Sequence, residues 1–293
     1  MIVCDRAGQT IPGQLRAAWL RELHPDVEVM RIDDVYPSDD SRLWAELTMR
    51  WLGCAPDAVF TSEDYGDAYA RFMGSVHVLV DRARATVPCS GTDVRADPLA
   101  CWEYLAPCVR AHFCKRVCVV GAESSGTTTL AAALAAHYNT VWVPEYGRTY
   151  SEAKTRRPDA GAWRSEEFVH IAREQCRREN EAARQANRLL VCDTDAFATA
   201  LWHERYMGTS SQAVAAGRRA DLYVLTDVDI PFVQDGTRDG EHLRCWMHDR
   251  FIAELTREGR PYVVVSGAHD ARLHAAIRSI EACVLRQRDT SPS

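Results

Sequence analysis

A glycine-rich loop follows an apolar run in the stretch VVGAESSGTTTL, residues 119–130. Gly121 and Gly126 have the spacing of a loop whose backbone amides converge on phosphate groups, and the helix that follows adds the positive end of its dipole. Thr128 falls where such a loop places a magnesium-contacting hydroxyl, whereas Thr127 falls where it normally carries a lysine. The residues predicted to bind ATP are Gly121, Ala122, Glu123, Ser124, Ser125, Gly126, Thr127 and Thr128.

The missing lysine weakens this predicted site without abolishing it. A hydrogen bond to a charged group contributes about 1.5 to 3 kcal/mol, so its loss costs roughly ten- to a hundredfold in rate. Lysine occurs only at Lys115 and Lys154, so an arginine is the expected replacement. The alternative interpretation is an ordinary strand-to-helix turn, in which Ser124, Ser125 and the threonines only cap the helix.

Two aspartates end a further apolar run, LLVCDTD at residues 189–195. Magnesium takes oxygen ligands and usually keeps several waters, so we expect Asp193 to act with Thr128 at the metal. If the site transfers a phosphoryl group, Asp195 is a candidate for orienting the hydroxyl group that accepts it. The alternative for both aspartates is a structural role as caps of the next helix.

Two other segments offer candidate catalytic charges. Glu145, in PEYGR, ends an apolar run and is a candidate general base, with Arg148 three residues later. The alternative is that these two side chains form a local pair. The polar stretch VQDGTRDGEHLR, residues 233–244, predicts a lid that closes Arg238 and Arg244 over ATP, although a plain surface loop has the same composition.

Short apolar runs alternate with longer amphipathic ones along the chain, which predicts an α/β fold with a parallel sheet. In the second part, long helices are expected over residues 165–188 and 270–286, and five strands over residues 116–121, 140–145, 189–195, 221–227 and 261–267. The first part repeats the alternation in shorter units. We expect two domains, residues 1–113 and 114–293.

The composition excludes several classes of function. A net charge of -6 in 293 residues argues against nucleic acid as the main partner, because duplex binding needs a basic face. The eleven cysteines show no CxxC spacing, and no apolar run has the roughly 18 residues of a membrane span. We therefore expect a cytoplasmic protein without a membrane partner. Association into a homo-oligomer is left open.

Taken together, the loop, PEYGR, LLVCDTD and QDGTRDGEHLR resemble the C-terminal kinase domain of the NadR family, which joins an adenylyltransferase to a nicotinamide riboside kinase. The resemblance implies a P-loop kinase that uses ATP and magnesium to phosphorylate the ribose hydroxyl of nicotinamide riboside, in NAD salvage. It also implies pyridine stacking for Tyr206 and for Trp202 or Trp142, with core packing as the alternative. A kinase for another nucleoside-like molecule, and a nucleotide-binding regulator with negligible turnover, remain alternatives.

The first part resembles the adenylyltransferase of the same family, a Rossmann-like nucleotidyltransferase domain, entered partway. The stretch VPCSGTDVRADP matches the SGTxxR segment of that family, which implies contacts to ATP phosphates in a vestigial nucleotide site. The residues concerned are Ser90, Gly91, Thr92 and Arg95. The HxGH motif of the family is missing, so we expect this part to be incomplete and to lack adenylyltransferase activity.

Overall fold

The computed structural model describes residues 1–37, 39–156, 161–233 and 241–285. The chain divides into two compact units, Met1–Tyr104 and Leu105–Ser293. The short helix α5 (Pro107–Phe113) thus goes with the second unit, so the division falls one helix earlier than the expected boundary at residues 113–114.

The second unit contains a five-stranded sheet in which every neighbouring pair of strands is parallel, in the order β6-β7-β5-β8-β9. The predicted parallel sheet is therefore confirmed. Expected strand 140–145 is shorter than predicted, because β6 pairs with β7 at two residues only. The strands are β5 (Lys115–Gly121), β6 (Trp142–Val143), β7 (Leu189–Asp193), β8 (Leu222–Thr226) and β9 (Tyr262–Val265).

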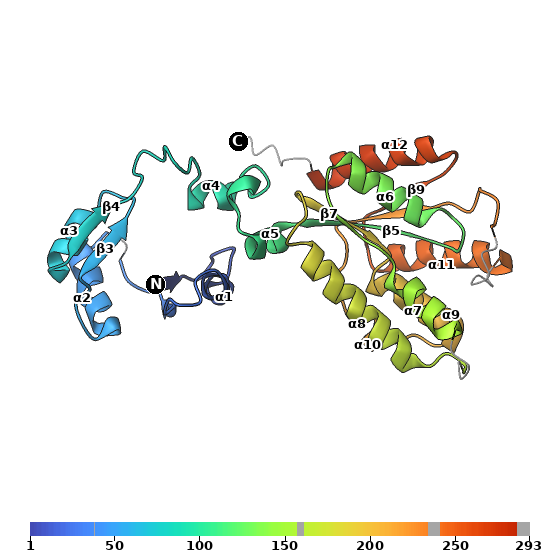
Figure 1. Cartoon of the computed structure of the whole chain (residues 1–293), viewed down its shortest axis with the longest axis horizontal. Helices are drawn as coiled ribbons and strands as arrows, with labels where there is room; N and C mark the ends of the chain where they lie inside the picture. The colour runs from blue at the N-terminus through green and yellow to red at the C-terminus, as the bar shows by residue number, and fades with distance from the viewer. Residues whose placement is uncertain (38, 157–160, 234–240, 286–293) are drawn as a thin grey trace. The chain divides into compact units, whose positions relative to one another are not determined.

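Helices cover both faces of this sheet (Figure 1), with α6 and α12 on one side and α8, α9 and α11 on the other. Both faces of β7 are consequently buried, which explains its continuous apolar sequence. The helices are α6 (Thr127–His137), α7 (Tyr146–Thr155), α8 (Ser165–Ala182), α9 (Ala196–Met207), α10 (Gln212–Ala215), α11 (Arg244–Arg257) and α12 (His269–Ile280).

Two helix ends differ from the sequence prediction. Helix α8 stops at Ala182 rather than near Arg188, because the chain must turn back into β7 and Arg188 adopts a left-handed conformation with φ of 64°. The last helix continues past Ile280 as one π-helical turn, Glu281–Leu285. Neither difference changes where β5 and β7 end.

The core of the second unit lies between α6, α12 and the sheet. It contains Val119 of β5, Leu130 and Leu134 of α6, Val224 of β8 and Ile280 of α12, all at most 1% exposed. The alanines of α6 let this helix approach the sheet closely, and so fix the start of the helix against the end of β5.

The first unit is also parallel α/β, but its strands pair in two separate sheets, β1 with β2 and β3 with β4. Its elements are β1 (Ile2–Asp5), α1 (Gly13–Leu23), β2 (Met30–Asp33), α2 (Ser41–Leu52), β3 (Ala58–Thr61), α3 (Gly66–Met73), β4 (Val76–Leu79), α4 (Gly91–Ala96) and a 3-10 turn, Trp102–Tyr104. Incompleteness of this unit stays a prediction.

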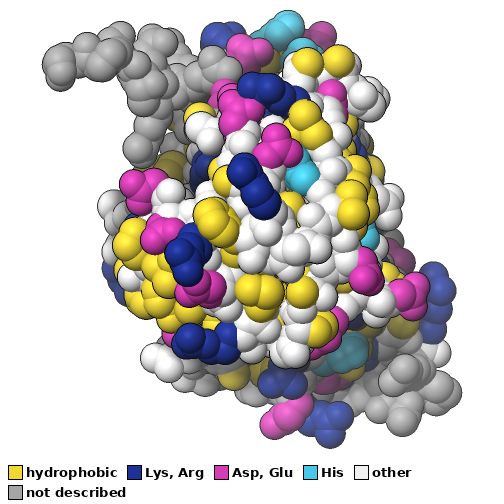
Figure 2. All heavy atoms as spheres, turned by 90° about the vertical axis from the view of Figure 1, so that its left-hand side faces the viewer, with side chains coloured by type: hydrophobic (Ala, Val, Ile, Leu, Met, Phe, Trp, Pro, Cys, Tyr) yellow, Lys and Arg dark blue, Asp and Glu magenta, His cyan; other side chains and the backbone are white. Residues whose placement is uncertain are grey.

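Figure 2 shows charges of both signs on one face of the molecule. On the face drawn in Figure 2, acidic, basic and hydrophobic side chains are interspersed, and the basic ones form no continuous stripe among the residues described there. Within the described parts of the chain, no helix is both long enough and apolar enough to cross a membrane.

Candidate functional site

A cavity of about 390 Å³ lies where β5 and β7 end and α6 begins. Its wall includes most of the predicted site residues from three separate segments: Gly121, Ala122, Glu123, Ser124, Gly126, Thr127, Thr128, Glu145, Arg148, Trp202 and Tyr206. The other lining residues carry no motif that marks them in the sequence; they are Thr129, Gly147, Ser151, Trp163, Phe168, Ile171, Thr194 and Thr199. The fold therefore brings the glycine-rich loop, Glu145 and the aromatic residues Trp202 and Tyr206 to one cavity.

The glycine-rich loop has the backbone conformation that its sequence predicts. Gly126 adopts φ of 86°, and a side chain at Gly121 would collide with Thr226 and Ser125. Ser125 is 1% exposed, and its hydroxyl donates to the carbonyl oxygen of Ala122 at 2.6 Å. Its side chain thus holds the loop together and does not line the cavity, unlike the other seven residues predicted to bind ATP.

Two buried arginines hold the loop from outside the cavity. Arg244 Nη2 donates to the carbonyl oxygens of Ser124, at 3.4 Å, and Ile230, at 3.0 Å. Arg272 Nη1 donates to the carbonyl oxygen of Ser125 at 2.6 Å. Arg244 was predicted to act on ATP from a lid, but here it supports the backbone of the loop. The second lid candidate, Arg238, lies outside the described residues.

We expect Arg272→Met to destabilise the protein. The guanidinium also donates to the carbonyl oxygens of Gly267 and Asp227 and pairs with Asp229, in a site where its side chain is 5% exposed. Removing it leaves several buried acceptors without a donor, so the free energy of unfolding should fall by about 2 to 4 kcal/mol. Urea denaturation measures this change.

The matched control is Arg278→Met, an exposed position on the same helix. Its free energy of unfolding should stay within about 0.5 kcal/mol of wild type. Equal stability of the two variants would contradict the role given to Arg272.

Asp193, the last residue of β7, lies directly beside the start of α6. Its Oδ2 accepts a hydrogen bond from the Thr128 hydroxyl at 2.6 Å, while its Oδ1 is buried without a hydrogen-bond partner among the described residues. Burial raises the pKa of this carboxyl, although the hydroxyls of Thr128 and Thr127 and the charge of Arg148 oppose the shift. A buried carboxylate with a free oxygen is suited to a cation.

This pair of oxygen donors fits magnesium. A hydroxyl and one carboxylate match a metal that keeps several waters and shares its remaining ligands with phosphates. Within the described residues, no group of three or more His, Cys, Asp or Glu side chains could hold a metal by itself. Thr128 and Asp193 are thus the residues that fit a metal shared with ATP.

Asp195 faces away from this pair. It caps α9, where Oδ1 accepts from the amide of Ala198 at 2.9 Å, and its Oδ2 accepts from the Tyr223 hydroxyl at 2.7 Å. The side chain is buried and does not line the cavity. Thr194, with φ of 65°, turns the chain between the two aspartates. This geometry favours the capping alternative for Asp195 over the predicted role at the acceptor.

Glu145 and Arg148 both line the cavity, at the start of α7. Arg148 Nε donates to Glu152 Oε1, one turn further along the helix, at 3.1 Å. The arginine is half-exposed and acts electrostatically on Asp193. Among the described residues that line the cavity, Arg148 is the one arginine.

Aromatic side chains form one part of the cavity wall, called here the aromatic wall: Trp163, Phe168, Trp202 and Tyr206. The ring centroid of Tyr206 lies 5.7 Å from that of Trp163 and 5.9 Å from that of Phe168, and Trp202 lines the cavity on the same helix as Tyr206. Trp163 precedes α8 in a loop, so no periodicity marked it as a site residue. Trp142 packs against the hydrophobic core and does not line the cavity, as the packing alternative predicted.

Arg205 connects this aromatic wall to the phosphate loop. Its guanidinium lies 5.2 and 4.9 Å from the ring centroids of Trp202 and Tyr206, and Nη1 donates to Glu123 Oε1 at 2.8 Å. The side chain is 6% exposed, so this contact is largely shielded from water.

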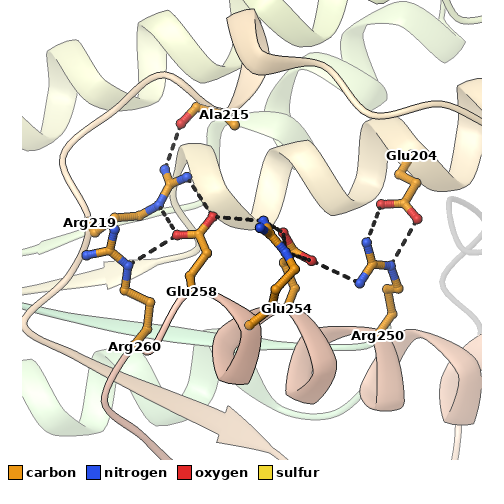
Figure 3. A network of polar contacts seen from close by, with 8 residues as sticks. Glu204, Ala215, Arg219, Arg250, Glu254, Glu258 and Arg260 are labelled. Atoms are coloured by element: carbon orange, nitrogen blue, oxygen red, sulfur yellow. Dashed lines mark hydrogen bonds and ion pairs between the residues drawn. The ribbon is translucent and has the colours of Figure 1, made fainter.

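A network of ion pairs along α11 includes one pair to α9, the helix that carries Trp202 and Tyr206 (Figure 3). Arg250 binds both carboxylate oxygens of Glu204 at 2.9 Å, and Arg219 binds Glu258 and the carbonyl oxygen of Ala215. Bidentate pairs fix geometry more strictly than single contacts do. The Arg250–Glu204 pair therefore restrains α9 relative to α11.

In the first unit, residues of the predicted vestigial nucleotide site make hydrogen bonds within their own short segment. Ser90 caps α4 and Asp93 bonds back to the Ser90 amide, which forms a reciprocal capping box. Arg95 Nη2 donates to the Thr92 hydroxyl at 3.0 Å, and Gly91 opens the helix. Binding of ATP phosphates by these residues stays a prediction.

The sheet, the glycine-rich loop and the Thr128–Asp193 pair define a P-loop protein. Residues 116–272, more than half of the chain, match the AAA domain family, and the chain belongs to that family.

Known relatives carry the name NadR, which confirms the resemblance noted in the sequence. The chain is 31% identical over 244 residues to the trifunctional NAD biosynthesis/regulator protein NadR of Escherichia coli K12, covering 78% of this chain and 58% of that protein. It is 34% identical over 212 residues to the protein of the same name from Salmonella typhimurium LT2, covering 70% of this chain and 51% of that protein. The chain thus spans little more than half the length of these relatives.

Two solved NadR structures share the fold of the whole chain. A NadR protein in complex with NR superposes with a TM-score of 0.78 at 21% identity, over 100% of this chain and 90% of that one. A NadR protein in complex with NAD and AMP-PNP superposes with a TM-score of 0.74 at 20% identity, over 98% and 88%.

Proposed function

We propose that the second unit is an ATP-dependent kinase that phosphorylates the ribose hydroxyl of nicotinamide riboside to give nicotinamide mononucleotide. The observation that carries this proposal is a single cavity that is lined by a phosphate loop, by Thr128, whose hydroxyl donates to Asp193, and by an aromatic wall. The NadR relatives support it, because one solved NadR structure holds NR and another holds AMP-PNP. The proposal places the activity in a NAD salvage reaction in the cytoplasm.

In this mechanism the amides of the glycine-rich loop hold the β- and γ-phosphates of ATP, and Thr128 and Asp193 hold magnesium. The metal, when bound, neutralises charge on the phosphates and orients the transferred group. The chain contributes position and electrostatic stabilisation, and phosphoryl transfer needs little else from a protein.

Glu145 is the proposed general base, because it lines the same cavity as the loop and the aromatic wall. It accepts the proton of the ribose hydroxyl as that oxygen attacks the γ-phosphorus, and ADP leaves. Arg148 stabilises the negative charge on the transferred group. It thereby supplies the cation that Thr127 cannot provide.

The variant Thr127→Lys tests whether the usual lysine is still compatible with this loop. Thr127 lines the cavity, so a lysine there can reach the phosphates, and ATP affinity should be preserved or raised by up to about tenfold. Isothermal titration calorimetry with ATP and magnesium measures the change. Ala136→Lys, at an exposed position near the other end of α6 that does not line the cavity, is the control and should not raise affinity. Loss of ATP binding in Thr127→Lys would mean that another cation already occupies the lysine position.

Release of ADP with a panel of acceptors tests the assigned substrate. Nicotinamide riboside, uridine, cytidine and adenosine are supplied separately with ATP and magnesium. Turnover with nicotinamide riboside at least tenfold above the others supports the proposal. Preference for another nucleoside keeps the kinase and changes its acceptor, whereas ATP binding without any transfer identifies a nucleotide-binding regulator.

A further inference from the structure

Gln175 of α8 connects the two segments that carry the proposed catalytic carboxylates. The side chain is 1% exposed. Its Oε1 accepts from the amide of Tyr146, the residue after Glu145, at 3.0 Å. Its Nε2 donates to the carbonyl oxygen of Thr194, the residue after Asp193, at 3.4 Å. A single amide thus bridges the start of α7 and the end of β7.

The bridge lies where the sheet no longer joins these segments. Strands β6 and β7 pair only at Trp142 with Val191 and at Val143 with Cys192, so the ladder ends before either carboxylate. The first amide of a helix has no acceptor within that helix. The carbonyl oxygen of Thr194 likewise lies just beyond the last strand residue. Both groups are satisfied by one side chain that offers a donor and an acceptor.

The same amide also contributes to the capping of α7. Glu145 occupies the N-cap position of α7, but its side chain makes no capping hydrogen bond. Gln175 takes over part of the capping role by accepting from the Tyr146 amide. The Glu145 carboxylate instead lines the cavity.

Helix α8 is itself tied to the central strand one turn beyond Gln175. Arg116 of β5 donates to Glu179 Oε2 at 3.0 Å and to Asn180 Oδ1 at 2.7 Å, and the Arg116 and Glu179 side chains are 4% and 2% exposed. Because buried contacts of this kind leave little freedom, α8 is a rigid support for the Gln175 amide.

We propose that Gln175 is a positioning residue that sets the placement of Glu145 relative to Asp193 for the reaction. The inference rests on the proposed kinase function. Gln175 does not line the cavity and so acts through the two backbone segments that it bridges.

The test replaces Gln175 with Met, which keeps the length and packing of the side chain but loses both hydrogen bonds. We expect kcat with nicotinamide riboside to fall roughly 10- to 30-fold, with KM for ATP changed less than about threefold. Gln185→Met, at an exposed position just after α8, is the control and should keep the wild-type kcat. A lower melting temperature with an unchanged kcat per folded molecule would show a purely structural role and overturn the inference.

A second measurement separates failure of this inference from failure of the proposed function. Absence of transfer by the wild-type protein overturns the function. The inference is then decided by calorimetry, because a displaced Asp193 should weaken the gain in ATP affinity that magnesium provides. The inference is supported if magnesium raises ATP affinity at least fivefold less in Gln175→Met than in wild type. Equal gains in affinity overturn the inference.

Discussion

Phosphoryl transfer by the Asp193→Asn variant should be about 100- to 1,000-fold slower than transfer by the wild-type protein. Asp193 bonds to Thr128 through Oδ2 and has a buried, unpartnered Oδ1 within the described structure, so its charge is the one best placed to hold the metal. The asparagine amide keeps the shape of the aspartate side chain but removes its negative charge. Losing about 3 to 4 kcal/mol of transition-state stabilisation corresponds to that change in rate.

The measurement is kcat at saturating ATP and magnesium, with Asp249→Asn as the control. Asp249 is an exposed aspartate on α11, so its variant should keep the wild-type rate. The thermal stability of Asp193→Asn should equal or exceed that of wild type, because burial raises the pKa of this carboxyl and disfavours its charged form. Unchanged turnover in Asp193→Asn would remove Asp193 from the metal site.

The Arg148→Met variant should lower kcat by roughly 10- to 100-fold, the equivalent of one charged hydrogen bond of about 1.5 to 3 kcal/mol. Arg148 is the arginine on the cavity wall, whereas Arg244 and Arg272 donate to the backbone of the loop from outside. Because the proposed contact forms with the transferred group, KM for nicotinamide riboside should change little.

Steady-state kinetics of Arg148→Met are compared with those of Arg173→Met, an exposed position on α8. The double variant with Thr127→Lys adds a sharper comparison, since a lysine in its usual place should restore at least part of the lost rate. Full activity in Arg148→Met alone would mean that another residue supplies the positive charge of the absent loop lysine.

The parts of the fold that sequence predicts best are those fixed by local pattern. The apolar runs of β5, β7 and β8 are buried on both faces, so their strand character is visible without tertiary information. The pairing of Thr128 with Asp193 was predictable as well, because parallel strands present their carboxyl ends at one edge of a sheet.

Other residues owe their role in the site to the packing of helices and strands, which the sequence does not show. Trp163 and Phe168 reach the cavity only because α8 packs against α9. Gln175 and Arg272 are polar residues within amphipathic helices, and nothing in their spacing distinguishes them from solvent-facing neighbours. For Asp195, the sequence left open an acceptor contact or a helix cap, because the backbone turn at Thr194, with φ of 65°, has no clear signal in the sequence.

The central claim is that the cavity transfers phosphate from ATP to nicotinamide riboside. Mass spectrometry of the wild-type protein incubated with ATP, magnesium and nicotinamide riboside tests it most directly, with Asp193→Asn as the matched sample. We predict that nicotinamide mononucleotide and ADP form in equal amounts with wild type and at least about 100-fold more slowly with the variant. Bound ATP with no mononucleotide formed by the wild-type protein would contradict the claim.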